Sequence, residues 1–255
     1  MDTDQLLEVA CYAGKLLIES GAEVYRVEET MVRLSTSFPE VEDAQSFVTT
    51  TGIMFSITVD KKTHTKILRV HTRGVDLNCI DKINHLSREA SSKQFTIDEL
   101  YNRLREIDQE KRYSIGMIIL FGALSAGGFA IFFNGTLMEA CFSFLIGIFI
   151  KVVSILLEKR GVHGFFTNAI AASVSAILAL AFHSLCKTAD VDIMIISSIM
   201  LLVPGLAITN AIRDTVAGDY LSGVARAAEA FLVAIAIAAG IGFVLSLSIG
   251  ISGGM

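Results

Sequence analysis

The residues best suited to chemistry surround an interruption in an apolar stretch near the carboxyl end of the chain. Pro204 removes a backbone donor and Gly205 lets the chain bend, so a helix in this stretch should break there. A helix restarting after the break presents four polar side chains: Thr209, Asn210, Arg213 and Asp214. Because arginine grips a carboxylate with two parallel hydrogen bonds, Arg213 predicts a small carboxylic or amino acid as ligand, oriented by Thr209 and Asn210. The alternative is a packing kink followed by an arginine that marks the membrane boundary.

Other ionisable residues lie in or beside apolar stretches, where a charge is costly. Lys151 would add positive potential to a ligand site, or its ammonium group would extend to the polar boundary of the membrane. Asp214, Asp219 and Glu229 are candidates for carrying a proton, since burial raises the pKa of a carboxyl group. Glu229 has an alternative partner in Arg226, three residues away.

The composition excludes several kinds of site. The five histidines form no close pair with carboxylates and the four cysteines show no CxxC spacing, so we expect no metal and no cofactor. A net charge of −5 provides no basic field for nucleic acid. Residues 1–114 place no nucleophile and base at a usable spacing, so no enzymatic activity is expected.

Charge is distributed very unevenly along the chain. Residues 1–114 carry 15 Lys/Arg and 19 Asp/Glu, whereas residues 115–255 carry 6 and 7. This contrast predicts a soluble domain at 1–114 and a membrane domain at 115–255. The expected fold class is an α+β cytoplasmic domain followed by an all-α polytopic membrane domain of about five transmembrane helices.

Spacing and capping signals predict the elements of the soluble domain. Apolar residues at helical spacing predict two helices within 4–36, where Gly21 ends the first and Ser20 with Glu23 forms a capping box for the second. Alternation within 45–70 predicts a small antiparallel sheet of two or three strands. Two further helices are expected over 77–91 and 96–112, the second opened by a capping box of Thr96 and Glu99.

Five apolar stretches, each near the ~20 residues needed to cross a bilayer, divide the second half of the chain. They cover residues 115–133, 138–157, 164–186, 192–212 and 224–251. Seven basic residues flank one set of connections and one, Lys187, flanks the other: Arg105, Lys111, Arg112, Lys159, Arg160, Arg213 and Arg226 form the set of seven. The positive-inside rule therefore predicts a cytoplasmic N-terminus, and five crossings place the C-terminus in the periplasm.

The last apolar stretch carries small residues every four positions. The series consists of Ala230, Ala234, Ala238, Gly242, Ser246 and Gly250. Such a ridge lets another helix approach closely, and that helix comes either from the same chain or from a partner subunit.

Four segments resemble the threonine/serine exporter family of bacterial inner-membrane proteins, and the resemblance covers almost the whole chain. They are SGAEVYRVEETM at 20–31, FVTTTGIMFS at 47–56, RVHTRGVDLNCIDKINHLSRE at 69–89 and SSIMLLVPGLAITNAIRDTVAGDYLSG at 197–223. Long members carry ten membrane helices in one chain. The split version is similar to this chain: a cytoplasmic domain with about five helices that works with a separate small hydrophobic protein.

The resemblance implies efflux of small polar acids, either threonine and serine or, for the split type, succinate and related C4-dicarboxylates. The family's polar membrane motif falls on Pro204, Gly205, Thr209, Asn210, Arg213, Asp214, Gly218 and Asp219. Its cytoplasmic motif falls on Gly21, Glu23, Arg26, Glu28, Asn84, Ser87 and Arg88.

The leading hypothesis is an oligomeric secondary transporter subunit of the bacterial inner membrane that exports small acids, coupled to protons, together with a small hydrophobic partner subunit. Arg213 would hold the cargo carboxylate, and Lys151 would add positive potential. One alternative is a membrane-anchored ligand-binding or hydrolase-like protein whose cytoplasmic domain is the active part. Another is a homo-oligomeric channel.

Overall fold

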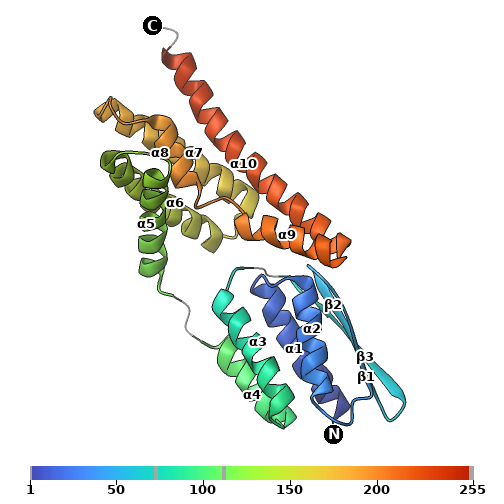
Figure 1. Cartoon of the computed structure of the whole chain (residues 1–255). Coiled ribbons are helices and arrows are strands. Elements are labelled where there is room, and N and C mark those ends of the chain that lie inside the picture. Colours follow the sequence, from blue (N-terminus) through green and yellow to red (C-terminus); the bar gives the residue numbers. More distant parts are fainter. Residues whose placement is uncertain (1, 72–73, 111–112, 253–255) are drawn as a thin grey trace. The chain divides into compact units, whose positions relative to one another are not determined.

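The computed structural model describes residues 2–71, 74–110 and 113–252. These residues form ten α-helices and one three-stranded sheet (Figure 1). By their contacts they group into two compact units. The N-terminal unit contains residues 1–111 and 206–228, and the second unit contains residues 112–205 and 229–255.

Helices and a small sheet build the first part of the N-terminal unit. Its helices are α1 (Thr3–Glu19), α2 (Val24–Thr36), α3 (Leu77–Ser92) and α4 (Ile97–Asp108). The antiparallel strands β1 (Asp43–Thr49), β2 (Gly52–Val59) and β3 (Lys62–Arg69) pair in the order β1-β2-β3. Alternate residues of a strand face opposite sides, and Ile53, Phe55 and Ile57 of β2 are the buried set, packed in one core with residues of α1 and α2.

The turn between α1 and α2 is fixed by its glycine. Gly21 has φ +85°, a backbone conformation that side chains disfavour, and a Cβ there would lie 2.9 Å from the carbonyl oxygen of Gly74. Both the backbone conformation and the lack of space therefore require glycine. The predicted capping box of Ser20 and Glu23 is wrong. Glu23 is itself the N-cap residue of α2, and its side chain makes no capping hydrogen bond. The capping box of Thr96 and Glu99 is confirmed at the start of α4.

The predicted fold class is wrong in its membrane part. Among the described residues, four helices are long and apolar enough to cross a membrane, not five. They are α5 (Ile115–Phe132), α6 (Leu137–Lys159), α7 (Gly164–Leu185) and α10 (Tyr220–Ser252). The stretch predicted over 192–212 is instead divided into two short helices, α8 (Val191–Ile199) and α9 (Gly205–Ala217).

The division has a backbone cause. Pro204 lacks the N–H that a continuing helix needs, and it lies between the end of α8 and the start of α9. The nine residues of α8 rise only about 14 Å at ~1.5 Å per residue, roughly half of the ~30 Å hydrocarbon layer.

The fold class is also wrong in treating everything after residue 114 as a membrane domain apart from the soluble one. Helix α9 and the first residues of α10 group with the N-terminal unit. Gly218, with φ +99°, makes the sharp turn that joins α9 to α10. Because the units are defined by contacts, the boundary between a soluble and a membrane domain near residue 114 stays a prediction. Lys111 and Arg112, which were among the basic residues used to predict the orientation, lie outside the described residues.

Small and hydroxyl side chains pack the second unit. A Cβ on Gly147 of α6 would lie 2.9 Å from that of Ala126 on α5, so these two helices pack closely. Hydroxyl contacts join α8 to its neighbours: Ser197 to Ser143 of α6 at 2.8 Å and Ser198 to Ser175 of α7 at 2.6 Å.

Candidate functional site

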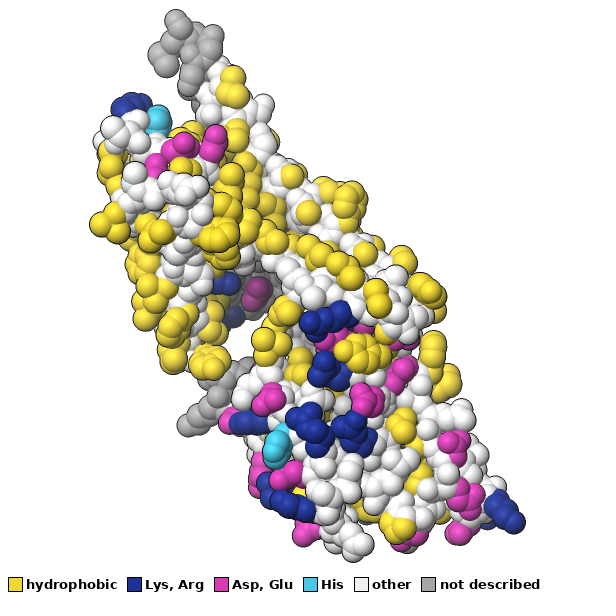
Figure 2. All heavy atoms as spheres, in the orientation of Figure 1, with side chains coloured by type: hydrophobic (Ala, Val, Ile, Leu, Met, Phe, Trp, Pro, Cys, Tyr) yellow, Lys and Arg dark blue, Asp and Glu magenta, His cyan; other side chains and the backbone are white. Residues whose placement is uncertain are grey.

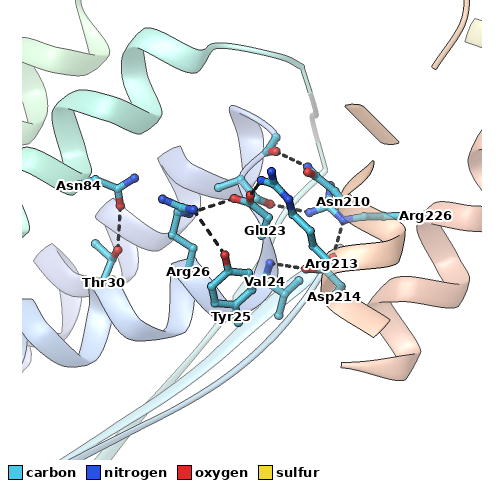
Figure 3. A network of polar contacts seen from close by, with 12 residues as sticks. Glu23, Val24, Tyr25, Arg26, Thr30, Asn84, Asn210, Arg213, Asp214 and Arg226 are labelled. Atoms are coloured by element: carbon cyan, nitrogen blue, oxygen red, sulfur yellow. Dashed lines mark hydrogen bonds and ion pairs between the residues drawn. The ribbon is translucent and has the colours of Figure 1, made fainter. Parts of the chain in front are cut away.

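The turn between α1 and α2 is bound by side chains from α9 and the start of α10, all within the N-terminal unit (Figure 3). Asn210 Nδ2 donates to the carbonyl oxygen of Gly21 at 2.8 Å, and Arg226 Nη2 donates to the carbonyl oxygen of Ala22 at 2.6 Å. Asp214 Oδ1 accepts the backbone N–H of Val24 at 3.0 Å.

Asp214 therefore supplies the cap that α2 lacks locally. Val24 is the first residue of α2, so its N–H has no partner inside the helix. A carboxylate beside a helix N-terminus also interacts favourably with the helix dipole. The residue that caps α2 thus comes from a segment 190 positions away in the sequence.

The carboxylate of Glu23 joins two arginines. Its Oε2 accepts from Arg26 Nε at 3.0 Å, while its Oε1 accepts from Arg213 Nη1. The side chain of Glu23 is 8% exposed, whereas those of Arg26 and Arg213 are 36% and 54% exposed. Figure 3 shows the three side chains in one group, with Arg26 also directed at the Tyr25 hydroxyl. A buried carboxylate is thus flanked by two guanidinium groups that remain open to solvent.

A second ion pair lies beside the first and is buried. Arg226 Nε is 3.0 Å from Asp214 Oδ2, with side chains 11% and 0% exposed. Neither of these two atoms makes a hydrogen bond, so the contact is an ion pair without a hydrogen bond. Each charge compensates the other in a place where neither could be left alone without a large desolvation cost.

We call this group of contacts the α2–α9 junction; it consists of Glu23, Val24, Arg26, Asn210, Arg213, Asp214 and Arg226. The carboxyl groups in and beside the junction have pKa values shifted in different directions. Burial opposes ionisation of Glu23, but hydrogen bonds from its own backbone N–H and from Arg213, with the charge of Arg26, lower its pKa overall. Burial raises the pKa of Asp214 despite the Val24 N–H and the Arg226 charge. Burial also raises the pKa of Asp219 and, with the charges of Asp219 and Asp214, that of Glu28.

The junction brings together residues from both sequence motifs. Asn210, Arg213 and Asp214 of the membrane motif contact the turn and helix that carry Glu23 and Arg26 of the cytoplasmic motif. Asp219 follows closely, since its N–H donates to the Asp214 carbonyl at 2.8 Å.

Other candidate residues occupy separate positions. In the N-terminal unit, Thr209 is exposed on α9, Arg88 is exposed on α3, and Glu28 Oε1 accepts the N–H of Val48 in β1 at 2.8 Å. Lys151 and Glu229 belong to the second unit. Lys151 lies against Gly122 of α5, where a Cβ would come within 2.9 Å of its side chain.

Sequence reasoning missed the role of Arg226. It was considered as a flanking cation for orientation and as a partner for Glu229 three residues away, whereas the structure pairs it with Asp214. Gly223 was the available signal, because a Cβ there would collide with Thr215 and lie 3.0 Å from the Ala211 carbonyl oxygen of α9. The missing side chain lets α10 begin close enough to α9 for the pair to form.

The two units also differ at their surfaces. Hydrophobic side chains are widespread on the visible surface of the helices of the second unit and charged ones are few, whereas Lys, Arg, Asp and Glu gather over the N-terminal unit (Figure 2). With four membrane-length helices, the chain has the composition of a membrane protein.

Comparison with known proteins identifies the family. The family described as "Putative threonine/serine exporter" matches residues 8–248, which is nearly the whole chain. The chain belongs to this exporter family. Family membership and its apolar helices make it a membrane transport protein.

Named relatives of the family fall into two lengths. The chain is 26% identical to the probable succinate transporter subunit YjjP of Escherichia coli K12, and the match covers 97% of both chains. It is 23% identical to the threonine/serine exporter of Corynebacterium glutamicum and 22% identical to the probable threonine/serine exporter of Mycobacterium tuberculosis. Those matches cover 95% and 94% of this chain but 51% and 46% of the relatives. No solved structure gives a significant match.

Proposed function

We propose that this chain is one subunit of a two-part exporter of small carboxylates, with C4-dicarboxylates as the first cargo class and threonine or serine as the second. The lengths support this order. The chain matches 97% of a probable succinate transporter subunit, but only about half of the threonine/serine exporters. As a transporter it would move its cargo unchanged, without acting as an enzyme.

The observation that carries the proposal is the position of Arg213. Its guanidinium group already holds one carboxylate, that of Glu23, while more than half of its side chain stays exposed. A guanidinium group has five N–H donors in a planar fork, so Arg213 is suited to receive a cargo carboxylate. Thr209, exposed four residues earlier on the same face of α9, would orient the cargo, together with the amide of Asn210.

Efflux of labelled succinate, threonine or serine from proteoliposomes that contain the chain together with its proposed partner subunit tests this role. The variant Arg213→Ala should lose transport by at least an order of magnitude, because the cargo carboxylate loses its charged partner. Arg33→Ala is the matched control, since Arg33 also pairs with a glutamate, Glu29, but on the exposed face of α2. Transport by Arg213→Ala at the rate of the control would remove Arg213 from the cargo site.

Proton coupling is proposed for the carboxyl groups near the junction. Asp214 and Asp219 have pKa values raised by burial, which favours uptake of a proton at a milder pH. Glu229 remains a further candidate in the second unit, and Lys151 there would add positive potential to the cargo path. Efflux driven by an imposed pH gradient, compared between wild type and Asp219→Asn, tests the coupling. Efflux that ignores the gradient in wild type would contradict it.

For orientation, we propose that the N-terminal unit faces the bacterial cytoplasm and that the C-terminus is periplasmic. Basic residues beside α6, α9 and α10 support the first point. Because α9 groups with the N-terminal unit, the chain must return to that side between α7 and α9, and α8 with the non-helical residues before Gly205 would make this return. Cysteine labelling from each side of inverted and right-side-out vesicles checks both ends.

A small hydrophobic partner subunit is the remaining part of the proposal. The relative of equal length is named a transporter subunit. On α10, Gly240 packs against α7, where Ser173 Oγ donates to its carbonyl oxygen at 3.0 Å. The predicted small-residue ridge at Ala234, Ala238 and Gly242 is exposed, which favours its use by another chain. Co-purification that is lost in Ala238→Phe and kept in Phe243→Leu would support the partner; retention in both would contradict this seat.

A further inference from the structure

The strongest unused feature of the α2–α9 junction is that one carboxylate is shared by two guanidinium groups. Glu23 gives a separate oxygen to Arg26 and to Arg213. Arg26 lies in the first turn of α2, three residues after the N-cap residue Glu23, whereas Arg213 comes from α9. Glu23 therefore has one local arginine and one from a distant segment.

Resting on the proposed function, we propose that Glu23 is an internal competitor of the cargo: it occupies Arg213 when no cargo is present and gives up that contact to a cargo carboxylate, while Arg26 keeps it neutralised. Glu23 and Arg26 are thereby positioning residues that set the affinity of the cargo site.

Burial explains why Arg26 is needed for this exchange. Glu23 is nearly buried, so a released and unpaired Glu23 carboxylate would carry a large desolvation cost. With Arg26 still 3.0 Å away, Glu23 keeps an opposite charge after Arg213 has left. In the exchange, the Glu23 carboxylate loses one of its two arginine contacts, but it is not left buried without a charged partner.

Arg213 is free to make the exchange because it does not hold the unit together alone. Its side chain is the most exposed member of the three. Asn210, Asp214 and Arg226 keep α9 and the start of α10 bound to Gly21, Ala22 and Val24 through separate contacts. Arg213 can therefore change its carboxylate partner while the junction stays assembled.

The test is calorimetric binding of succinate to the whole chain in lipid nanodiscs, reconstituted with the small membrane protein that co-purifies with it, and threonine is the second probe. Removing the competitor in Glu23→Gln should lower the Kd at least five-fold. Removing its second partner in Arg26→Gln should raise the Kd at least five-fold, because Glu23 then holds Arg213 more tightly. Glu23→Asp, whose shorter side chain cannot reach both guanidinium groups equally, should fall between wild type and Glu23→Gln.

Glu29→Gln and Arg33→Gln are charge-matched controls on the same helix, and both should leave the Kd within two-fold of wild type. The opposite shifts at Glu23 and Arg26 should persist at about 1 M salt, where the Debye length is ~3 Å and long-range charge effects are screened. A merely structural role would weaken binding in both variants.

Two failures are distinguishable. If the wild type binds succinate but Glu23→Gln binds it equally or more weakly, the competitor role is overturned and the proposed function stands. If the wild type binds neither succinate nor threonine, the proposed function fails, and the competitor role falls with it.

Discussion

Two polar regions of this protein differ in the charge and the burial of the side chains that form them. In the second unit, α8 is held by the serine pairs Ser143–Ser197 and Ser175–Ser198, in which all four side chains are fully buried and uncharged. At the α2–α9 junction of the N-terminal unit, charged groups pair instead, and two of the arginines stay partly exposed.

The difference indicates which region only holds helices together and which region could exchange a bound carboxylate. A buried hydroxyl group that is hydrogen-bonded to its neighbour gains little from changing partners, because breaking that bond leaves a buried polar group without a hydrogen bond. A half-exposed guanidinium group can exchange one carboxylate for another, because water and a second charge are available during the change. This difference supports the proposal that a small acid is received at the junction.

The largest expected effect lies at the buried ion pair. Asp214→Ala leaves the Arg226 guanidinium buried without its charge partner and removes the cap of α2, which should cost about 3–5 kcal/mol of unfolding free energy. Denaturant unfolding in detergent, with Glu29→Ala as the exposed control, measures it. A loss no larger than that of the control would mean that the pair does not hold the junction.

Gly223→Ala should have the next largest effect. The added Cβ collides with Thr215, so α10 must shift away from α9, at a cost of about 1–3 kcal/mol. Gly242→Ala is the control on the same helix, because nothing lies within 4 Å of its Cβ position. Equal melting temperatures for the two variants would contradict the close approach of α9 and α10.

Breaking a serine pair should cost less. Ser197→Ala removes one hydroxyl from the contact with Ser143, and the expected loss is about 1 kcal/mol. Transport should be retained, in contrast to changes at the junction. A loss of more than ~3 kcal/mol, the upper end for an unsatisfied buried group, would show that the neutral core carries as much as the charged junction.

The pH dependence sharpens the same comparison. A lowered pKa means that Glu23 stabilises the folded state above its unfolded pKa of 4.5, and that this contribution is lost as pH falls through the folded pKa. Wild type should therefore lose more stability than Glu23→Gln on acidification below pH 4.5. Parallel stability curves for the two proteins would contradict the ion pairing of Glu23.

The raised pKa of Asp214 acts in the other direction. Its ionisation costs folding free energy, so this contribution to stability is greatest below its unfolded pKa of 3.8 and is lost as pH rises through the folded pKa. Arg226 limits the loss by pairing with the ionised form.

Local signals predicted much of the local structure. Gly21 ends α1 in the left-handed region, and Thr96 with Glu99 caps α4, because both signals act within a few residues. Hydropathy averaged over 192–212 hid the polar face of α9, so this stretch was counted as a fifth crossing with a break at Pro204. Helix α9 instead groups with the N-terminal unit. The contacts of Glu23 with Arg213 and of Val24 with Asp214 join residues 190 positions apart, and no spacing in one sequence encodes such a pairing.

The central claim is that Arg213 holds the cargo and does more than anchor α9. A charge reversal separates the two roles. Arg213→Glu places two carboxylates together and should lower both stability and succinate efflux, while the double variant Glu23→Arg/Arg213→Glu restores an ion pair in the opposite sense. We predict that stability recovers in the double variant and succinate efflux does not, because the arginine is no longer on α9. Recovery of efflux together with stability would contradict the account, since it would make the contact purely structural.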